Sequence, residues 1–117
     1  MNHSVSNQKL HHFLVAQDEV WPEVLLELKN GRKETHWMWF VFPQLLGLGK
    51  SSMSIKYAIK NDGHANAYWN HPVLGPRLRE CFALVEQSGK KPIEIFGEID
   101  TMKYNSCKNL FKSIAEN

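Results

Sequence analysis

The stretch THWMWFVFPQ, residues 35–44, departs most from ordinary patterning in this chain of 117 residues. On a helix, both of its faces would be apolar or aromatic. One face would carry Trp37, Phe40 and Val41, and the other would carry His36, Trp39 and Pro43. A helix of this kind must be central in the fold or line a cavity. Pro43 disfavours helical geometry in the preceding residue, so we expect a helix over 35–42, with a short aromatic-rich strand as the alternative.

Two roles are open to the side chains of this stretch. Trp37 and Phe40 are predicted to be core residues, because they share the helical face with Val41. Trp39 and His36 are the better pocket candidates. His36 can donate, accept or titrate near neutral pH, although a hydrogen-bonded structural role is the alternative for a lone histidine beside aromatic residues.

Helical spacing continues on both sides of this stretch. The N-terminal part predicts a helix around Leu10–Leu14 after the cap-type residues Ser6 and Asn7, then a second helix, capped by Asp18, that ends near Gly31. The C-terminal part predicts a short helix from Ser52 or Ser54, helices over 64–70 (capped by Asp62) and 76–87, one turn over 92–96 ending at Gly97, and a last helix capped by Asp100. We therefore expect an all-α single domain over residues 1–117 with six to eight short helices, residues 1–6 being disordered.

Composition limits the classes of function. The chain is 43% hydrophobic and 22% charged, with a net charge of +2, which is too mild to indicate a nucleic-acid or anionic-membrane surface. The N-terminal residues lack the hydrophobic region of a secretory signal peptide. The longest hydrophobic stretch, 37–42, is too short to span a bilayer. Cys81 and Cys107 lie far apart and are expected to be buried free thiols. These features predict a cytoplasmic protein with no membrane contact.

Four runs carry a resemblance to a known family. They are HWMWFVFPQLLGLGKS at 36–51, YAI at 57–59, AYWNHPVLGPRLRE at 67–80 and IFGEIDTMKYNSCKNLF at 95–111. Together they resemble the bacterial domain-of-unknown-function family 1810, which is often labelled calpastatin, over about residues 10 to 112. The resemblance implies a single-domain helical fold and no assigned reaction.

The calpastatin label conflicts with the sequence on physical grounds. Calpastatin inhibitory regions are disordered segments that fold on a protease, whereas four tryptophans and long amphipathic stripes indicate a folded core. Family members usually continue for another helical segment, so the resemblance implies that this C-terminal segment is absent here, through truncation or as a natural short form. One wall of the domain would then be missing or supplied by a partner chain.

The polar residues in the matching runs are mostly donors or cations, and acids are sparse among them. This asymmetry suits an anion such as phosphate or carboxylate. The candidate ligand-binding residues, taken with the pocket aromatic Trp39, are His36, Trp39, Gln44, Lys50, Ser51, Tyr57, His71, Arg77, Lys103 and Ser106. Among them we expect His36, Trp39, Arg77 and Lys103 to converge on one cleft.

The glycine-flanked loop GLGKSS, residues 47–52, is expected to order around an anion through Lys50 and Ser51, with a plain turn as the alternative. It lacks the phosphate-loop spacing GxxxxGK[ST] and follows no predicted strand, which disfavours a nucleotide triphosphatase.

Metal sites and common catalytic groups find little support. No metal site or cofactor is predicted: His11 and His12 are adjacent and point to different sides of a helix, and neither His64 nor His71 has a matching ligand pattern. A triad of Ser51, His36 or His71, and Asp100 lacks the GxSxG elbow. A nucleophilic Cys81 or Cys107 is disfavoured by their apolar stripes.

Two classes of function remain, and the sequence leaves open whether the protein is an enzyme. The first is a small-molecule pocket, binding or hydrolytic, for an anionic, nucleotide-like or ADP-ribose-like ligand, with Trp37 and Trp39 as walls. The second is an interaction module whose aromatic surface packs on a protein partner or a second copy of the chain. Nucleic-acid binding through Arg77 and Arg79 is the least favoured, because the neighbouring Glu80 indicates an ordinary solvated surface.

Overall fold

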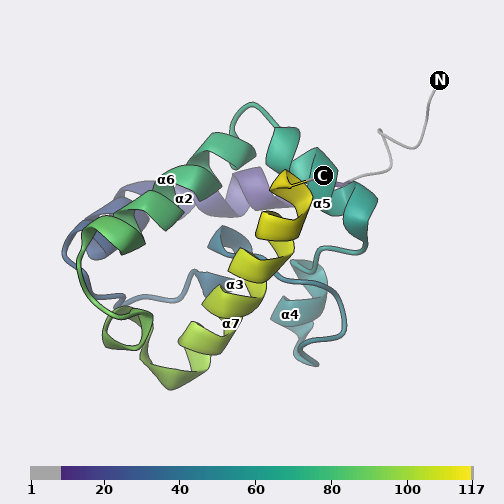
Figure 1. Cartoon of the computed structure of the whole chain (residues 1–117). Coiled ribbons are helices and arrows are strands. Elements are labelled where there is room, and N and C mark those ends of the chain that lie inside the picture. The colour runs from purple at the N-terminus through teal and green to yellow at the C-terminus, as the bar shows by residue number, and fades with distance from the viewer. Residues whose placement is uncertain (1–8, 117) are drawn as a thin grey trace.

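The described residues of the computed structural model, 9–116, form six helices and no β-strand (Figure 1). The helices are α2 (His11–Lys29), α3 (Met38–Val41), α4 (Ser52–Lys56), α5 (Asp62–Asn70), α6 (Leu74–Gln87) and α7 (Pro92–Ala115). The predicted all-α fold is confirmed. The predicted disorder of residues 1–6 and the Ser6 and Asn7 caps lie outside the described residues. Within residues 9–116, no helix has both the length and the apolar character needed to cross a bilayer.

The N-terminal pair of predicted helices is one continuous helix, α2. Asp18 does not cap a second segment; it lies exposed on the helix and pairs with Arg77. Pro22 stands inside the helix and removes one backbone donor. The helix continues through it because the face carrying Phe13, Gln17, Val24 and Leu28 is buried along its whole length.

The helix predicted over 35–42 is only the single turn α3, so most of that prediction is wrong. Trp37, its N-cap, has non-helical dihedral angles (φ −136°, ψ 6°), and Phe42 ends the turn at φ −121°, ψ 71°. Pro43 accounts for the early end. The late start follows from hydrogen bonds that hold residues 34–37 on α2 in place of helical ones.

The last two predicted helices form the two parts of α7, which are separated by a kink at the non-helical Gly97 (φ 79°, ψ 176°). Gly97 thus breaks the helix as predicted, since this conformation strongly favours glycine. Asp100 is not a cap; its carboxylate binds two lysines instead. The helix α4 begins at Ser52, one of the two predicted starts, with Ser51 as its cap, whereas α5 is capped by Asn61, one residue before the predicted Asp62.

The core is built from aromatic side chains around α3. Phe42 meets Phe96 and Tyr104 edge-on, with ring centroids 5.7 and 5.2 Å apart, and lies 6.2 Å from Trp37. Trp37 and Phe40 are buried, as predicted. In Figure 1, α7 crosses in front of α3, and α6 lies to its upper left, in front of α2. The single-turn α3 is therefore central, and the residues that follow it reach the surface beside α7.

A buried carboxylate fixes the approach to α3. Glu27, on α2, accepts hydrogen bonds from the backbone N–H of Glu34 (2.7 Å) and of Thr35 (3.0 Å), from the Thr35 hydroxyl (2.7 Å) and from the Trp37 indole (3.0 Å). Burial by itself raises the pKa of Glu27, but these donors outweigh it and hold the pKa below the ordinary value. Glu27 therefore stabilises the fold as an anion.

Replacing Trp37 with alanine should lower the free energy of unfolding by about 3–5 kcal/mol, because it empties a fully buried site beside Phe42 and removes a donor to Glu27. Urea denaturation measures the loss. The matched control is Val15→Ala, since Val15 is 48% exposed on α2. A Trp37→Ala protein as stable as the control would contradict the core assignment.

Glu27→Gln should cost about 1.5–3 kcal/mol near neutral pH, the usual effect of hydrogen bonds to a charged group. The stabilisation by Glu27 is present above about pH 4.5 and is lost as the pH falls below it, because its pKa is lower in the folded chain than the ordinary 4.5.

Thermal unfolding between pH 7 and pH 3 checks this sign. The wild-type melting temperature should fall more steeply with acid than that of Glu27→Gln, whereas Glu23→Gln, an exposed change on the same helix, should follow the wild type. If acid lowered the melting temperatures of Glu27→Gln and the wild type equally, the ionised Glu27 carboxylate would not stabilise the fold.

Candidate ligand-binding site

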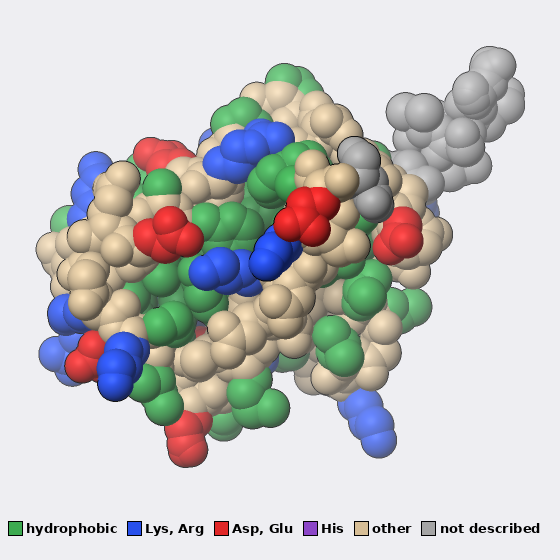
Figure 2. Space-filling model, in the orientation of Figure 1, with side chains coloured by type: hydrophobic (Ala, Val, Ile, Leu, Met, Phe, Trp, Pro, Cys, Tyr) green, Lys and Arg blue, Asp and Glu red, His purple; other side chains and the backbone are tan. Residues whose placement is uncertain are grey.

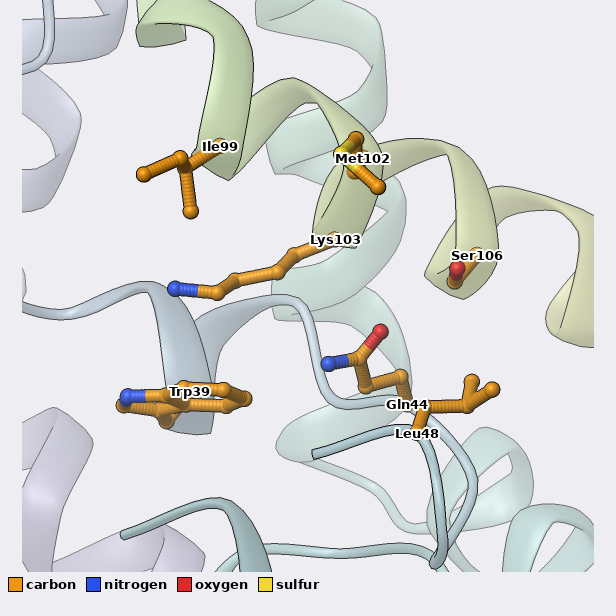
Figure 3. Close-up of a pocket in the computed structure, with 7 residues that line it drawn as sticks. All are labelled: Trp39, Gln44, Leu48, Ile99, Met102, Lys103 and Ser106. Atoms are coloured by element: carbon orange, nitrogen blue, oxygen red, sulfur yellow. The ribbon is translucent and has the colours of Figure 1, made fainter. Parts of the chain in front are cut away.

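A groove of about 270 Å³ lies between one side formed by α3 with the segment that follows it and the other side formed by the middle of α7. Figure 3 shows the side chains of this Trp39–Lys103 groove facing one another from the two segments. Its lining residues are Trp39, Gln44, Leu48, Ile99, Met102, Lys103 and Ser106.

Lys103 crosses the groove from α7 to Trp39. Its Nζ lies 4.0 Å from the Trp39 ring centroid, a cation–π contact, and 3.1 Å from Oδ1 of Asp100. An ammonium group has three donors. The carboxylate takes one and the indole faces the ammonium, so a further N–H is free to meet a ligand in the groove.

Asp100 joins two lysines beside the groove. Its Oδ2 lies 2.9 Å from Nζ of Lys33, whose ammonium is also 5.2 Å from the Trp37 ring centroid. Burial by itself raises the pKa of Asp100, but the hydrogen bonds from Lys33 and Lys103 outweigh it and lower the pKa. Two cations and one anion leave one net positive charge here, with the side chains only 9–19% exposed.

Gln44 supplies a polar group of a different kind. Its backbone is fixed by an isolated parallel bridge, in which the Ile59 N–H donates to the Gln44 carbonyl (2.9 Å) and the Leu46 N–H donates to the Ile59 carbonyl (2.8 Å). The residue is 8% exposed, yet its side-chain amide makes no hydrogen bond to any described residue. In Figure 3 the amide lies in the groove between Trp39 and Ser106. Because the amide opens on the groove, its hydrogen-bond partner there is water or a ligand.

The rim of the groove is apolar. Leu48, Ile99 and Met102 are 59%, 71% and 71% exposed, although all three are large hydrophobic residues. Gly49 packs close to Trp39: a Cβ there would lie 2.8 Å from Cβ of Ser54 and 3.4 Å from Cη2 of Trp39. The groove therefore combines a cationic, amide-lined interior with a hydrophobic edge.

Four of the ten predicted ligand-binding residues line this groove: Trp39, Gln44, Lys103 and Ser106. The expected convergence is wrong for Arg77. Its guanidinium lies over the Trp21 ring (4.7 Å), is paired with Asp18 (2.8 Å) and donates to Gln17 (3.3 Å). His36 is exposed and does not line the groove.

The remaining predicted residues lie outside the groove, and three of them have clear structural contacts. Ser51 caps α4 by accepting from the Ser54 N–H, and Tyr57 packs in the core against Phe40 at 5.3 Å. His71 accepts from two backbone N–H groups at the start of α6. Lys50 is exposed.

The sequence pattern did not single out several groove residues. Asp100 and Lys103 are three residues apart on a helix, a spacing that allows an ion pair, but the prediction treated Asp100 as a cap. Lys33 reaches Asp100 from a distant loop, so no local signal marks it. Ile99 and Met102 resemble ordinary apolar helix residues in the sequence.

Comparisons with known proteins agree with the fold. The crystal structure of the conserved hypothetical protein Rv1873 from Mycobacterium tuberculosis is similar, with 47% sequence identity and a TM-score of 0.88. The match covers 91% of this chain and 76% of that one. No match was found among curated proteins. A family model described as "Protein of unknown function (DUF1810)" matches residues 7–117. The chain therefore belongs to the DUF1810 family.

Proposed function

We propose that the protein binds a small organic anion in the Trp39–Lys103 groove. The observation that carries the proposal is the amide of Gln44, which has no hydrogen-bond partner among the described residues and opens on the same groove as the Lys103 ammonium. An ammonium and an amide N–H₂ are donors that a carboxylate or phosphate group accepts from. The Ser106 hydroxyl adds a third group able to donate.

The size of the groove restricts the ligand. Pockets for drug-sized ligands are usually about 300–1,000 Å³, so 270 Å³ suits a fragment such as a phosphate with part of a sugar. The Lys103 ammonium already faces the Trp39 ring, which disfavours an aromatic base stacked there. A nucleotide-like or ADP-ribose-like compound would place its anionic group inside and extend past the rim.

The lining supports binding more than hydrolysis. Lys103 is the one titratable side chain among the seven lining residues, and the Asp100 beside it has both oxygens engaged by lysines. A hydrolase needs a general base within reach of the attacking water or hydroxyl. Binding is therefore the activity that we assign to this groove.

A second candidate function rests on the hydrophobic rim. Leu48, Ile99 and Met102 form an exposed apolar edge that suits contact with a protein partner or a second copy of the chain. Met102→Glu would then disrupt the complex, and light scattering would detect a change in oligomeric state if the partner is a second copy.

The proposal also includes a cytoplasmic location. Its support is that Cys81 and Cys107 are both free and buried, as is usual in a reducing compartment.

Ribose 5-phosphate, AMP and ADP-ribose should each raise the melting temperature by mass action, and ribose alone should not. The site-specific readout is the NMR signal of the Trp39 indole N–H, assigned with Trp39→Phe. Lys103→Gln and Gln44→Leu should each abolish both responses: the ligand-induced shift of the Trp39 signal and the ligand-induced rise in melting temperature.

The matched control is Lys29→Gln, an exposed lysine on α2 that should leave both responses intact. The proposal fails if no anion at millimolar concentration moves the Trp39 signal. It also fails if the response survives in a folded Lys103→Gln protein.

A further inference from the structure

A second hollow lies on the face of the molecule between α6 and α7. Both helices pack against α5 and make few direct contacts with each other, so side chains form the floor between them. The volume of this α6–α7 hollow is about 190 Å³. Its lining residues are Trp69, Phe82, Glu86, Lys108, Phe111, Lys112 and Ala115.

The floor of the hollow is aromatic. Trp69 and Phe111 stack with ring centroids 5.7 Å apart and an interplanar angle of 27°. Phe82 is half-buried at the other side and packs against Phe42 at 5.6 Å. Aromatic pairs add about 0.5–1.5 kcal/mol beyond the area that they bury, so a ring is the group that this floor favours.

Cations surround the floor. The Arg79 guanidinium lies 4.0 Å from the Trp69 ring centroid, and Lys108 and Lys112 line the hollow from α7. Glu86 is the one acid in the lining, and its contact with Lys108 is long (3.7 Å) and exposed. Lys112 forms no ion pair with any described residue. Figure 2 shows this hydrophobic hollow with basic side chains above and below it and acidic side chains to its left and right.

We propose that the α6–α7 hollow binds a small aromatic carboxylate, with its ring among the edges of Trp69, Phe82 and Phe111 and its acid group at Lys112. A cavity of about 150 Å³ is known to hold benzene, so 190 Å³ accommodates one ring and a short acid arm. The surrounding positive charge selects the ionised acid over a neutral molecule of the same shape. This site is separate from the Trp39–Lys103 groove, and the two lists of lining residues share no member.

The test compares phenylacetate with phenylacetamide, which has nearly the same shape without the charge. The readout is the methyl signal of Ala115, which lines the hollow, in protein labelled at its alanine methyl groups. The buried Ala58 and Ala65 do not line the hollow and serve as internal references. Phenylacetate should shift the Ala115 signal and bind about three-fold or more tightly than phenylacetamide, the scale expected of an exposed charge contact.

Two lysine variants locate the anion contact. Lys112→Gln should bring the two dissociation constants together, and Lys29→Gln should leave their ratio unchanged. The proposal is overturned if millimolar phenylacetate leaves Ala115 unmoved, if phenylacetamide binds wild-type protein equally well, or if Lys112→Gln keeps the preference. Because the readout is at Ala115, none of these results bears on the Trp39 signal that tests the other groove.

Discussion

The Glu27 carboxylate determines how the chain enters the centre of this fold. Its hydrogen bonds to Glu34, Thr35 and Trp37 replace the bonds that a longer helix would have made there. Burying a carboxylate is costly unless such donors surround it, so carboxylate and loop stabilise each other. As a result α3 starts at Met38, and Trp39 is placed at the surface beside α7.

The same loop supplies the charge balance of the groove. Lys33 leaves the loop to meet Asp100 on α7, and Asp100 holds Lys103 at the Trp39 ring. The Lys33 N–H also donates to the Ile95 carbonyl at 2.9 Å, which ties the loop to the first turn of α7. This Lys33–Asp100–Lys103 arrangement keeps the Lys103 ammonium partly buried. Solvent screens its attraction for an anion less there than at an exposed site.

Much of the architecture could be predicted from the sequence, because apolar spacing gives helices directly. The last helix was expected after Asp100, where Tyr104, Cys107, Phe111 and Ile114 are buried on α7, and Gly97 correctly marked the bend of α7. Two of the failures share one cause. The late start of α3 and the ion pair of Asp100 with Lys33 depend on groups from other segments, which compete with local capping and helix propensity.

The candidate groove was predictable to a similar degree. Trp39, Gln44, Lys103 and Ser106 were found through residue chemistry within the family-like runs, and they do lie together. Arg77 has the same chemistry, but Asp18, Gln17 and Trp21 already surround it. The exposed Ile99 and Met102 could not be assigned, because a helix pattern does not show which apolar residues stay uncovered.

The central claim is that the loop held by Glu27 sets Trp39 against Lys103. The most direct measurement is the NMR position of the Lys103 ε-methylene protons and their through-space contacts with the Trp39 ring. An ammonium 4.0 Å from the ring centroid predicts strong upfield ring-current shifts and clear contacts, both reduced in a folded Glu27→Gln protein. Lys103 signals at ordinary exposed positions in the wild type, or unchanged in Glu27→Gln, would contradict the account.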